Sequence, residues 1–196
     1  MTPVAVALFA FYALLTYLLG AAPFGLILAR RFAGVDVRLE GSGNIGATNV
    51  ARSAGRGLGA ATLALDLGKG LLPTLGAVLL LPEPWMALAV GFAAVIGHCW
   101  PVWLRFDGGK GVATSAGVLL VLAPLPALVT AGVWILVFAV FKKSSLASLV
   151  ALVAIQVGLW WSSPELLNLS VPLALVLLVC HRANIVRLLR GTEEGV

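Results

Sequence analysis

The chain has 196 residues, of which 61% are hydrophobic and 11% are charged, and its formal net charge is +5. This apolar surface is more than one soluble core of this size can bury, which excludes an ordinary soluble domain. The composition therefore predicts an all-α integral membrane protein. The positive charge does not indicate binding to nucleic acid, because the basic residues lie in short groups at the ends of apolar runs and form no aromatic-interleaved face.

Seven apolar segments are candidate transmembrane helices, since a span needs roughly 20 apolar residues, or fewer when it is buried among other helices. The first segment has no basic residue before it and Arg30 and Arg31 directly after it, the reverse of the charge order in a signal peptide, so we expect it to be retained as a span. No linker is long enough to separate two domains, so we expect residues 1–196 to form one membrane domain. In chain order the segments are Val4–Leu28, Leu58–Leu81, Trp85–Trp103, Val112–Leu122, Ala127–Phe141, Leu146–Trp161 and Leu169–Val186.

The positions of the charges decide whether the fourth and fifth segments are two spans or one. If Ala123–Pro126 is a turn, seven spans place every Lys and Arg except Lys69 on one side of the membrane. If the two segments are continuous, Lys142 and Lys143 fall on the opposite side. The positive-inside rule therefore favours seven transmembrane helices, with the N-terminus outside and the C-terminus in the cytoplasm.

The first long polar interruption is the glycine-rich stretch Gly41–Arg52, which we call the first glycine loop. Its glycines fit the G-x-G-x-x-G pattern of dinucleotide-binding folds, but Asp66, at the spacing of the acidic ribose ligand, lies inside an apolar span and not at the end of a strand. A P-loop is also disfavoured, because Ala47–Thr48 stands where Lys–Ser/Thr is required. Flexible backbone rich in N–H donors beside Arg52 indicates an anion site. The alternative is a polar interfacial loop, which would not need this many directed hydrogen-bonding side chains: Ser42, Asn44, Thr48 and Asn49.

The second glycine loop, Gly108–Thr114, places Lys110 among glycines directly before an apolar segment. The glycines leave the backbone open to a ligand, and we expect the positive end of the following helix dipole to face the same anion. Seven spans put both glycine loops and the tail His181–Glu194 on the cytoplasmic face, so three distant segments can build one site. Asp66 and Lys69 share a helix face and can pair, either as a structural ion pair or in support of that site.

His181 and Asn184 also share a helix face, at the end of the last apolar segment. A histidine at that place is either a cap or a functional group. Together, His98–Cys99 and Cys180–His181 contain the donor atoms of a zinc site, but adjacent pairs lack the usual ligand spacing. We therefore expect no metal.

The motif residues fall into four groups along the chain: Gly41-Ser42-Gly43-Asn44 through Arg52, Asp66 with Lys69-Gly70, Gly97-His98 with Pro101 through Thr114, and His181 with Asn184, Arg187, Leu188, Gly191, Thr192 and Glu193. In these residues, and over essentially its whole length, the chain resembles the bacterial membrane-embedded acyl-phosphate:glycerol-3-phosphate acyltransferases. The resemblance implies seven spans in the bacterial cytoplasmic (inner) membrane, with the active site facing the cytoplasm. Asp107 departs from the family pattern, because a basic residue more often precedes the glycines of the second loop.

The resemblance also implies a set of site residues. It implies that five are catalytic: Ser42, Arg52, Lys110, His181 and Asn184. It implies that a larger set binds the substrates and their phosphates: Gly41, Gly43, Asn44, Thr48, Asn49, Gly108, Gly109, Gly111, Thr114, Ser145, Ser148, Arg187 and Glu193. Asp66 and Lys69 are expected to give structural support.

The reaction that the resemblance implies moves a fatty acyl group from acyl phosphate to the 1-hydroxyl of glycerol 3-phosphate, the first step of phospholipid synthesis, and needs no cofactor. Acyl phosphate is a mixed anhydride with a good leaving group, so we expect direct transfer without an acyl-enzyme. The His-x4-Asp dyad of the other glycerol-phosphate acyltransferase class is absent, because Trp103 and Val186 stand five residues after His98 and His181. Either His181 or a substrate phosphate could take the hydroxyl proton.

The expected partners are the two small-molecule substrates and the lipid bilayer, with a soluble enzyme as the possible source of acyl phosphate. The main rival function is transport of a phosphorylated metabolite. A transporter needs polar access from the outer side, whereas the predicted outer loops Pro82–Pro84 and Ser162–Asn168 are short and lack cations. The sequence therefore favours the enzyme.

Overall fold

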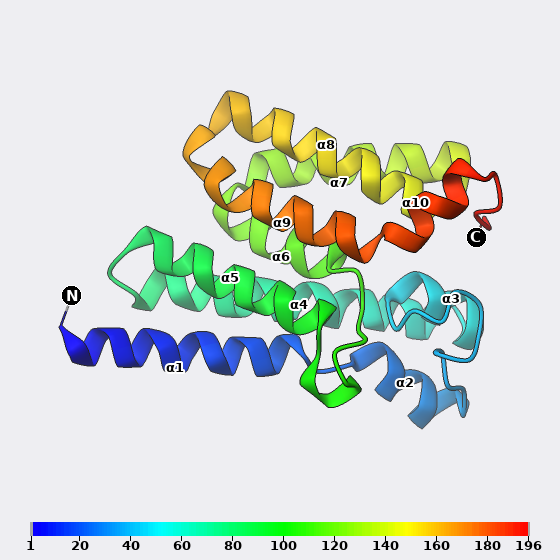
Figure 1. The fold of residues 1–196 in the computed structure, drawn as a ribbon, viewed down its shortest axis with the longest axis horizontal. Coiled ribbons are helices and arrows are strands. Elements are labelled where there is room, and N and C mark those ends of the chain that lie inside the picture. The colour runs from blue at the N-terminus through cyan, green and yellow to red at the C-terminus, as the bar shows by residue number, and fades with distance from the viewer. Residues whose placement is uncertain (1, 196) are drawn as a thin grey trace. The chain divides into compact units, whose positions relative to one another are not determined.

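The computed structural model describes residues 2–195, and within them every regular element is a helix (Figure 1), which confirms the all-α prediction. The chain forms two compact units, Met1–Val121 and Leu122–Val196. The α-helices are α1 (Pro3–Gly20), α2 (Phe24–Ala33), α3 (Ala47–Ala54), α4 (Arg56–Leu80), α5 (Pro84–Cys99), α6 (Val112–Leu122), α7 (Pro124–Phe141), α8 (Ser144–Ser162), α9 (Leu167–Cys180) and α10 (Arg182–Leu189), with two short 3₁₀ turns, η1 (Val102–Leu104) and η2 (Pro164–Leu166).

The turn expected at Ala123–Pro126 separates two helices. α6 ends at Leu122 and α7 begins at Pro124, and Ala123 between them has φ −148° and ψ 70°, outside the helical region. Pro124 occupies the first turn of α7, where its missing N–H leaves no helical hydrogen bond unmade. The fourth and fifth apolar segments are therefore separate helices.

The first apolar segment, Val4–Leu28, was expected to be a span, and it lies within the stretch Pro3–Ala33, which is long and apolar enough to cross a bilayer but is broken into two helices. α1 ends at Gly20 and α2 begins at Phe24, with Pro23 between them as the N-cap of α2. Pro23 has no N–H with which to continue α1, and its ring disfavours helical geometry at Ala22. The break leaves the Ala22 carbonyl accessible to the side chain of Lys69, whose Nζ lies 3.1 Å from it.

The last apolar segment, Leu169–Val186, is also broken into two helices, which together are long and apolar enough for one bent span. α9 ends at Cys180 and α10 begins at Arg182, and the two are bent by 63° about His181. Both the backbone N–H and the Nδ1 of His181 contact the Leu177 carbonyl, at 2.9 and 2.7 Å. A side chain that shares this carbonyl competes with the helical hydrogen bond and favours a local bend.

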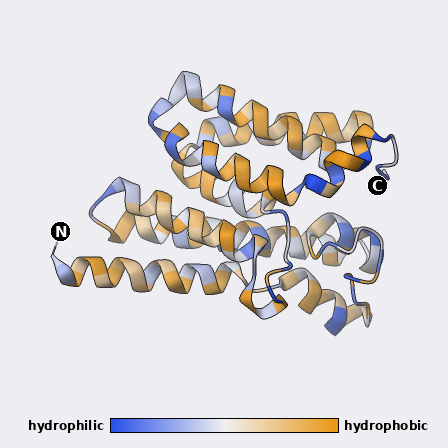
Figure 2. Ribbon diagram, in the orientation of Figure 1, coloured by the Kyte–Doolittle hydropathy of each residue, from blue (hydrophilic) through white to orange (hydrophobic). Residues whose placement is uncertain are grey.

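Within the described residues, five helical stretches are long and apolar enough to cross a bilayer, counting Pro3–Ala33 as one, and the bent α9–α10 pair would make six. Figure 2 shows apolar residues along most helices of both units. α6 has 11 residues. It is therefore about 16 Å long, roughly half of the ~30 Å hydrocarbon core. The count of seven spans and the orientation of the termini remain predictions that rest on the charge pattern.

In the first unit, α1, α4 and α5 lie side by side (Figure 1). α1 and α5 approach closely at small residues, because a Cβ on Gly20 would overlap the backbone of Ala94, and one on Gly97 would overlap the Tyr17 carbonyl. The Tyr17 hydroxyl also donates to the Trp100 carbonyl at 2.9 Å. Close approach at small residues is the usual way in which membrane helices pack. These contacts fix the end of α5 that leads into the second glycine loop.

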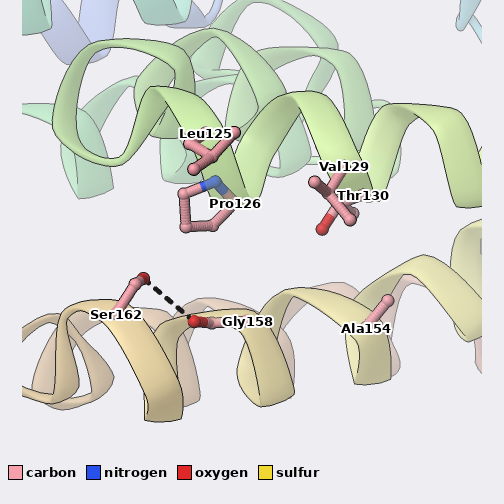
Figure 3. Close-up of a pocket in the computed structure, with 7 residues that line it drawn as sticks. All are labelled: Leu125, Pro126, Val129, Thr130, Ala154, Gly158 and Ser162. Atoms are coloured by element: carbon pink, nitrogen blue, oxygen red, sulfur yellow. Dashed lines mark hydrogen bonds between the residues drawn. The ribbon is translucent and has the colours of Figure 1, made fainter.

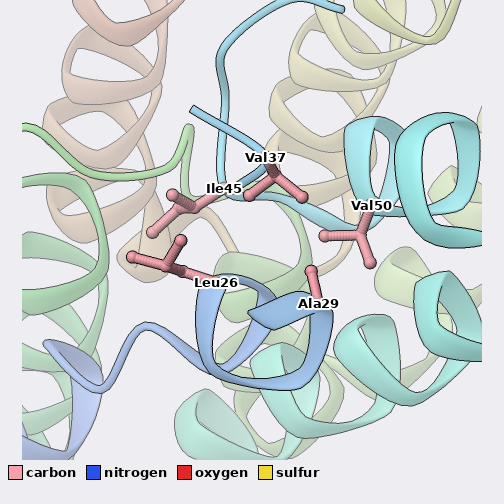
Figure 4. Close-up of a cluster of buried hydrophobic side chains, with 5 residues drawn as sticks. All are labelled: Leu26, Ala29, Val37, Ile45 and Val50. Atoms are coloured by element: carbon pink, nitrogen blue, oxygen red, sulfur yellow. The ribbon is translucent and has the colours of Figure 1, made fainter. Parts of the chain in front are cut away.

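A small apolar core anchors the first glycine loop between α2 and α3 (Figure 4). Full burial of a Val, Leu or Ile side chain stabilises a fold by about 1.5–3 kcal/mol. The core therefore holds the backbone of the loop through Ile45 and Val50. It consists of five residues that are each at most 4% exposed: Leu26, Ala29, Val37, Ile45 and Val50.

In the second unit, α7 packs along α8, and α9 lies beside α8. A groove of about 200 Å³ lies between α7 and α8 (Figure 3), and no predicted site residue lines it. Its one marked hydrogen bond, from the Ser162 hydroxyl to the Gly158 carbonyl at 2.9 Å, stays within α8. The groove is therefore a feature of an apolar helix surface and not the candidate site. It is lined by Leu125, Pro126, Val129, Thr130, Ala154, Gly158 and Ser162.

Candidate active site

The first glycine loop is folded around the side chain of Asn49, which is 3% exposed. Its Nδ2 donates to the carbonyls of Val37, Glu40 and Asn44, at 2.8, 3.0 and 2.9 Å. Its Oδ1 accepts the backbone N–H of Ser42 at 3.0 Å. One buried amide thus satisfies backbone groups along the whole loop and sets the position of Ser42.

Two glycines of this loop are required by its geometry. Gly41 and Gly43 have φ +55° and +71°, in the left-handed region where residues with a Cβ are strained. A Cβ on Gly41 would also lie 2.5 Å from Oδ1 of Asn49. The structure therefore accounts for both glycines by loop shape, whether or not they also approach a ligand.

The two glycine loops adjoin each other within the first unit. Asn44 donates from Nδ2 to the Gly108 carbonyl at 3.4 Å, across 64 positions of the chain. The Oδ1 of the same side chain accepts the N–H of Gly46, the residue that caps α3, at 3.0 Å. The two loops, which were expected to contribute to one site, are thus joined by a hydrogen bond from Asn44.

The predicted cations of the first unit are carried by these loops. Arg52 lies in the last turn of α3 and is exposed, and Lys110 lies in the second glycine loop and is half-buried. α6 begins at Val112, as expected. Thr114 is fully buried in the first turn of α6, and its hydroxyl makes no hydrogen bond within residues 2–195.

The second glycine loop is held against the end of α5. The Gly109 N–H donates to the His98 carbonyl at 3.0 Å, and a Cβ on Gly109 would overlap the imidazole of His98. Gly108 is equally confined, since a Cβ there would overlap the His98 carbonyl and the ring of Pro101. Lys110 therefore follows two residues whose backbone is pressed onto α5.

The predicted pair of Asp66 and Lys69 is confirmed, and it is buried. Nζ of Lys69 lies 2.9 Å from Oδ1 of Asp66, and both side chains are at most 4% exposed. Nδ1 of His98 lies 3.6 Å from the same oxygen. Sequence reasoning gave His98 no role, because α4 and α5 bring it to Asp66 only in three dimensions.

In the second unit, three of the predicted polar residues donate hydrogen bonds to the carboxylate of Glu193. Its Oε1 accepts from the Ser145 hydroxyl at 2.5 Å and from Nδ2 of Asn184 at 2.7 Å. Its Oε2 accepts from Nε of Arg187 at 2.6 Å. Burial raises the pKa of the Glu193 carboxyl, whereas the hydrogen bonds from Ser145, Asn184 and Arg187 lower it. Together the hydrogen bonds have the larger effect, so this pKa lies below the usual glutamate range.

His181 lies between α9 and α10, and its ring contacts the last turn of α9. Its side chain is 1% exposed, and Nδ1 lies 2.7 Å from the Leu177 carbonyl. A carbonyl oxygen only accepts hydrogen bonds, so Nδ1 carries a proton, and in the neutral ring Nε2 holds the lone pair. The amide nitrogen of Asn184, which was expected to share a helix face with His181, donates to Glu193.

Ser148 lies one turn after Ser145 on α8. Its hydroxyl accepts from Nε1 of Trp134 at 3.0 Å and donates to the Ser144 carbonyl at 2.8 Å. The predicted site residues are thus divided between the two compact units. The first contains Gly41, Ser42, Gly43, Asn44, Thr48, Asn49, Arg52, Asp66, Lys69, Gly108, Gly109, Lys110, Gly111 and Thr114, and the second contains Ser145, Ser148, His181, Asn184, Arg187 and Glu193.

Comparison with known proteins gives consistent matches over nearly the whole chain. The family model described as glycerol-3-phosphate acyltransferase matches residues 10–191. The chain is 55% identical to a glycerol-3-phosphate acyltransferase of Myxococcus xanthus over 185 residues, which cover 92% of this chain and 96% of the relative. It is 49% identical to one of Mesorhizobium japonicum over 181 residues, which cover 92% of each chain.

Two solved structures have the same fold. One is the crystal structure of PlsY, an integral membrane glycerol 3-phosphate acyltransferase, in its glycerol 3-phosphate form, with a TM-score of 0.90, 38% identity and coverage of 96% of this chain and 95% of that one. The other is the lysophosphatidic acid form of PlsY, with a TM-score of 0.88, 37% identity and coverage of 95% and 94%.

Proposed function

This chain belongs to the glycerol-3-phosphate acyltransferase family of integral membrane proteins, and from that premise we propose that it transfers a fatty acyl group from acyl phosphate to the 1-hydroxyl of glycerol 3-phosphate. The products are 1-acyl-glycerol 3-phosphate (lysophosphatidic acid) and inorganic phosphate. The observation that carries the proposal is the match of this chain, over 96% and 95% of its length, to PlsY structures in a glycerol 3-phosphate form and a lysophosphatidic acid form.

The reaction is a direct transfer. The oxygen of the 1-hydroxyl attacks the carbonyl carbon of the acyl phosphate and forms the ester bond. The bond between that carbon and the phosphate oxygen breaks, and phosphate leaves with the electron pair. Because phosphate is a good leaving group, the protein has only to hold the two anionic reactants together and to stabilise the charge that develops.

The cations of the first unit suit this task. Arg52 and Lys110 would neutralise the two phosphates, while Ser42 and the glycine N–H groups would support the acyl carbonyl or the leaving phosphate. The support for this assignment is geometric, since Asn49 sets the Ser42 backbone and Asn44 joins the two glycine loops. The loops therefore offer backbone donors and positive charge within one compact unit.

The residues of the second unit would bind glycerol phosphate and handle its proton. With Nδ1 protonated toward the Leu177 carbonyl, Nε2 of His181 is the nitrogen that could accept the proton of the 1-hydroxyl. A phosphate oxygen of a substrate is the alternative acceptor. Glu193 would hold Asn184 and Arg187 in place for the substrate, since its own oxygens already accept three hydrogen bonds.

The site would face the cytoplasm from the bacterial cytoplasmic membrane. This placement rests on the basic residues, which seven spans collect on one side, and on the chemistry of the reactants. The acyl chain needs apolar surroundings, whereas glycerol 3-phosphate and an acyl phosphate supplied by a soluble enzyme would arrive from water.

The direct test is an assay of the purified full chain in lipid vesicles with palmitoyl phosphate and labelled glycerol 3-phosphate. We expect lysophosphatidic acid from palmitoyl phosphate and none from palmitoyl-coenzyme A. Arg52→Ala and Lys110→Ala are each expected to lower kcat/KM by about 100-fold or more, because each removes charge stabilisation in the transition state.

Arg56→Ala is the matched control, since Arg56 is an exposed cation four residues after Arg52 that has no part in the proposed site. We expect it to keep activity within about threefold of wild type, as for other surface substitutions. A wild-type chain that forms no lysophosphatidic acid from palmitoyl phosphate would overturn the proposed reaction. Full activity of both Arg52→Ala and Lys110→Ala would overturn only the assignment of the cations.

A further inference from the structure

A buried polar cluster of the first unit has no part in the proposed reaction. It consists of Asp66 and Lys69 on α4 and His98 on α5, each at most 4% exposed. The charge of Lys69 is accounted for, because its Nζ lies 2.9 Å from Asp66 and 3.1 Å from the Ala22 carbonyl, and 5.6 Å from the centre of the Phe24 ring. A lysine paired in this way does not need the histidine.

His98 is the member that the ion pair leaves unexplained. Its Nδ1 lies 3.6 Å from Oδ1 of Asp66, beyond hydrogen-bond distance, and within residues 2–195 it has no hydrogen-bond partner. A buried ring nitrogen without a hydrogen bond is unfavourable, and an apolar side chain would avoid this loss. The reason for a histidine must then lie in what the other side of its ring contacts.

The other side of the ring faces the second glycine loop. A Cβ on Gly109 would overlap Nε2, Cε1 and Cδ2 of His98, so the Gly109 backbone lies directly against the imidazole. The Gly109 N–H also donates to the His98 carbonyl at 3.0 Å. His98 thus contacts Gly109, the residue directly before Lys110, through both its ring and its backbone carbonyl.

We propose that His98 is a positioning residue for Lys110: its imidazole, set between Asp66 and Gly109, is the support that holds the second glycine loop in the conformation used for acyl transfer. This inference rests on the proposed function of Lys110. Three glycines surround Lys110, so the loop has little conformational preference of its own. A cation stabilises a transition state only if it is held in place beforehand, and a shift of about 1 Å can cost on the order of 100-fold in rate.

A double-mutant cycle with Lys110 tests the proposal. His98→Ala is expected to lower kcat/KM for lysophosphatidic acid formation by about 10- to 100-fold, mainly through kcat. In the Lys110→Ala background the same substitution should have no further effect, because the group that it positions is gone. A merely structural histidine would cause the same loss in both backgrounds. Met86→Ala is the matched control, since it empties a fully buried site on the same helix and is expected to lower the melting temperature but leave kcat/KM within about threefold.

The contact can also be tested from the side of the loop. Gly109→Ala should inactivate the enzyme by forcing the loop off the ring, and His98→Ala added to it should restore part of the lost activity, because the smaller side chain leaves room for the methyl group. Gly68→Ala is the control for the glycine change, since nothing lies within 4 Å of a Cβ at that position. A double variant that is no more active than Gly109→Ala alone would contradict the proposal.

Hydrogen–deuterium exchange of the full chain in vesicles supplies a readout that does not depend on activity. Exchange across residues 104–112 is expected to rise in His98→Ala and to stay at the wild-type level in Met86→Ala. Unchanged exchange in His98→Ala would overturn the proposal. An inactive wild type would overturn the proposed function and this role with it, whereas an active wild type with independent losses in the Lys110 cycle would overturn the role of His98 alone.

Discussion

Two side chains that were predicted to bind substrate are engaged with the protein itself. The amide of Asn49 contacts three carbonyls and one N–H of the first glycine loop, and the carboxylate of Glu193 accepts hydrogen bonds from three side chains of the second unit. A carboxylate would also repel a phosphate. We therefore expect both residues to shape the site through their neighbours, without direct contact to the substrate.

Glu193→Gln should make the stability of the protein less dependent on acidic pH. The hydrogen bonds from Ser145, Asn184 and Arg187 lower the pKa of Glu193 against the opposing effect of burial, so the folded state binds the proton less readily than the unfolded state. The stabilisation is therefore complete at neutral pH and is lost as the pH falls below about 5, where unfolded glutamates begin to protonate.

Thermal unfolding in detergent between pH 7 and pH 3 measures this effect. We expect Glu193→Gln to lower the melting temperature at pH 7, since hydrogen bonds to a charged group are worth about 1.5–3 kcal/mol. At low pH the difference in melting temperature between the variant and wild type should become smaller. Glu194→Gln is the matched control at the exposed neighbouring position. A difference in melting temperature that stays constant over this pH range would contradict the coupling between the protonation of Glu193 and stability.

The helices that deviate from prediction do so at places that matter for the site. The break at Pro23 presents the Ala22 carbonyl to Lys69, and the bend lies at His181, whose Nδ1 contacts the Leu177 carbonyl. A proline in the sequence could have signalled the first break. The second lies at His181, where the neighbouring sequence has neither a proline nor a glycine to signal it.

α6 is the short helix that follows Lys110, and its contact with α4 is expected to be sensitive to small additions. A Cβ on Gly117 would overlap the Leu67 carbonyl, and one on Gly70 would overlap the Thr114 carbonyl. Gly117→Ala should therefore push α6 away from α4, at a cost of roughly 1–3 kcal/mol, and lower acyltransferase activity by about tenfold or more.

Gly132→Ala is the control for this change, because a Cβ on Gly132, in α7, has nothing within 4 Å. The melting temperature and the initial rate of both variants in vesicles are the measurements. Equal behaviour of the two variants would show that close packing of α6 on α4 is not needed.

The molecule as a whole is a membrane protein whose orientation is read from its charges. Seven spans with the N-terminus outside would leave Glu165 in an outer loop and Thr192 in the cytoplasm. In a background with both native cysteines replaced by alanine, a membrane-impermeant maleimide added to whole cells should label Glu165→Cys. Thr192→Cys should react only after the membrane is opened. The reverse labelling pattern would invert the proposed orientation and place the basic loops outside.

Composition alone sufficed for the membrane class, because burial of this much apolar surface needs lipid. Motif order sufficed for the family, and spacing sufficed for the pair of Asp66 and Lys69, because three residues along a helix fix a shared face. Composition, motif order and residue spacing can all be taken directly from the sequence without knowledge of the tertiary structure.

The contacts that shape the candidate site are not local. Asn44 meets Gly108 across 64 positions, and the Ser145 hydroxyl meets Glu193 across 48. His98 reaches Gly109 because Pro101 and the loop after it turn the chain back onto α5. Such pairs depend on how helices pack and where loops reverse, which no periodicity in the chain records. The sequence therefore indicates the chemistry of the two glycine loops. Only the tertiary structure shows that the first loop is folded around the amide of Asn49 and that the second lies against the imidazole of His98.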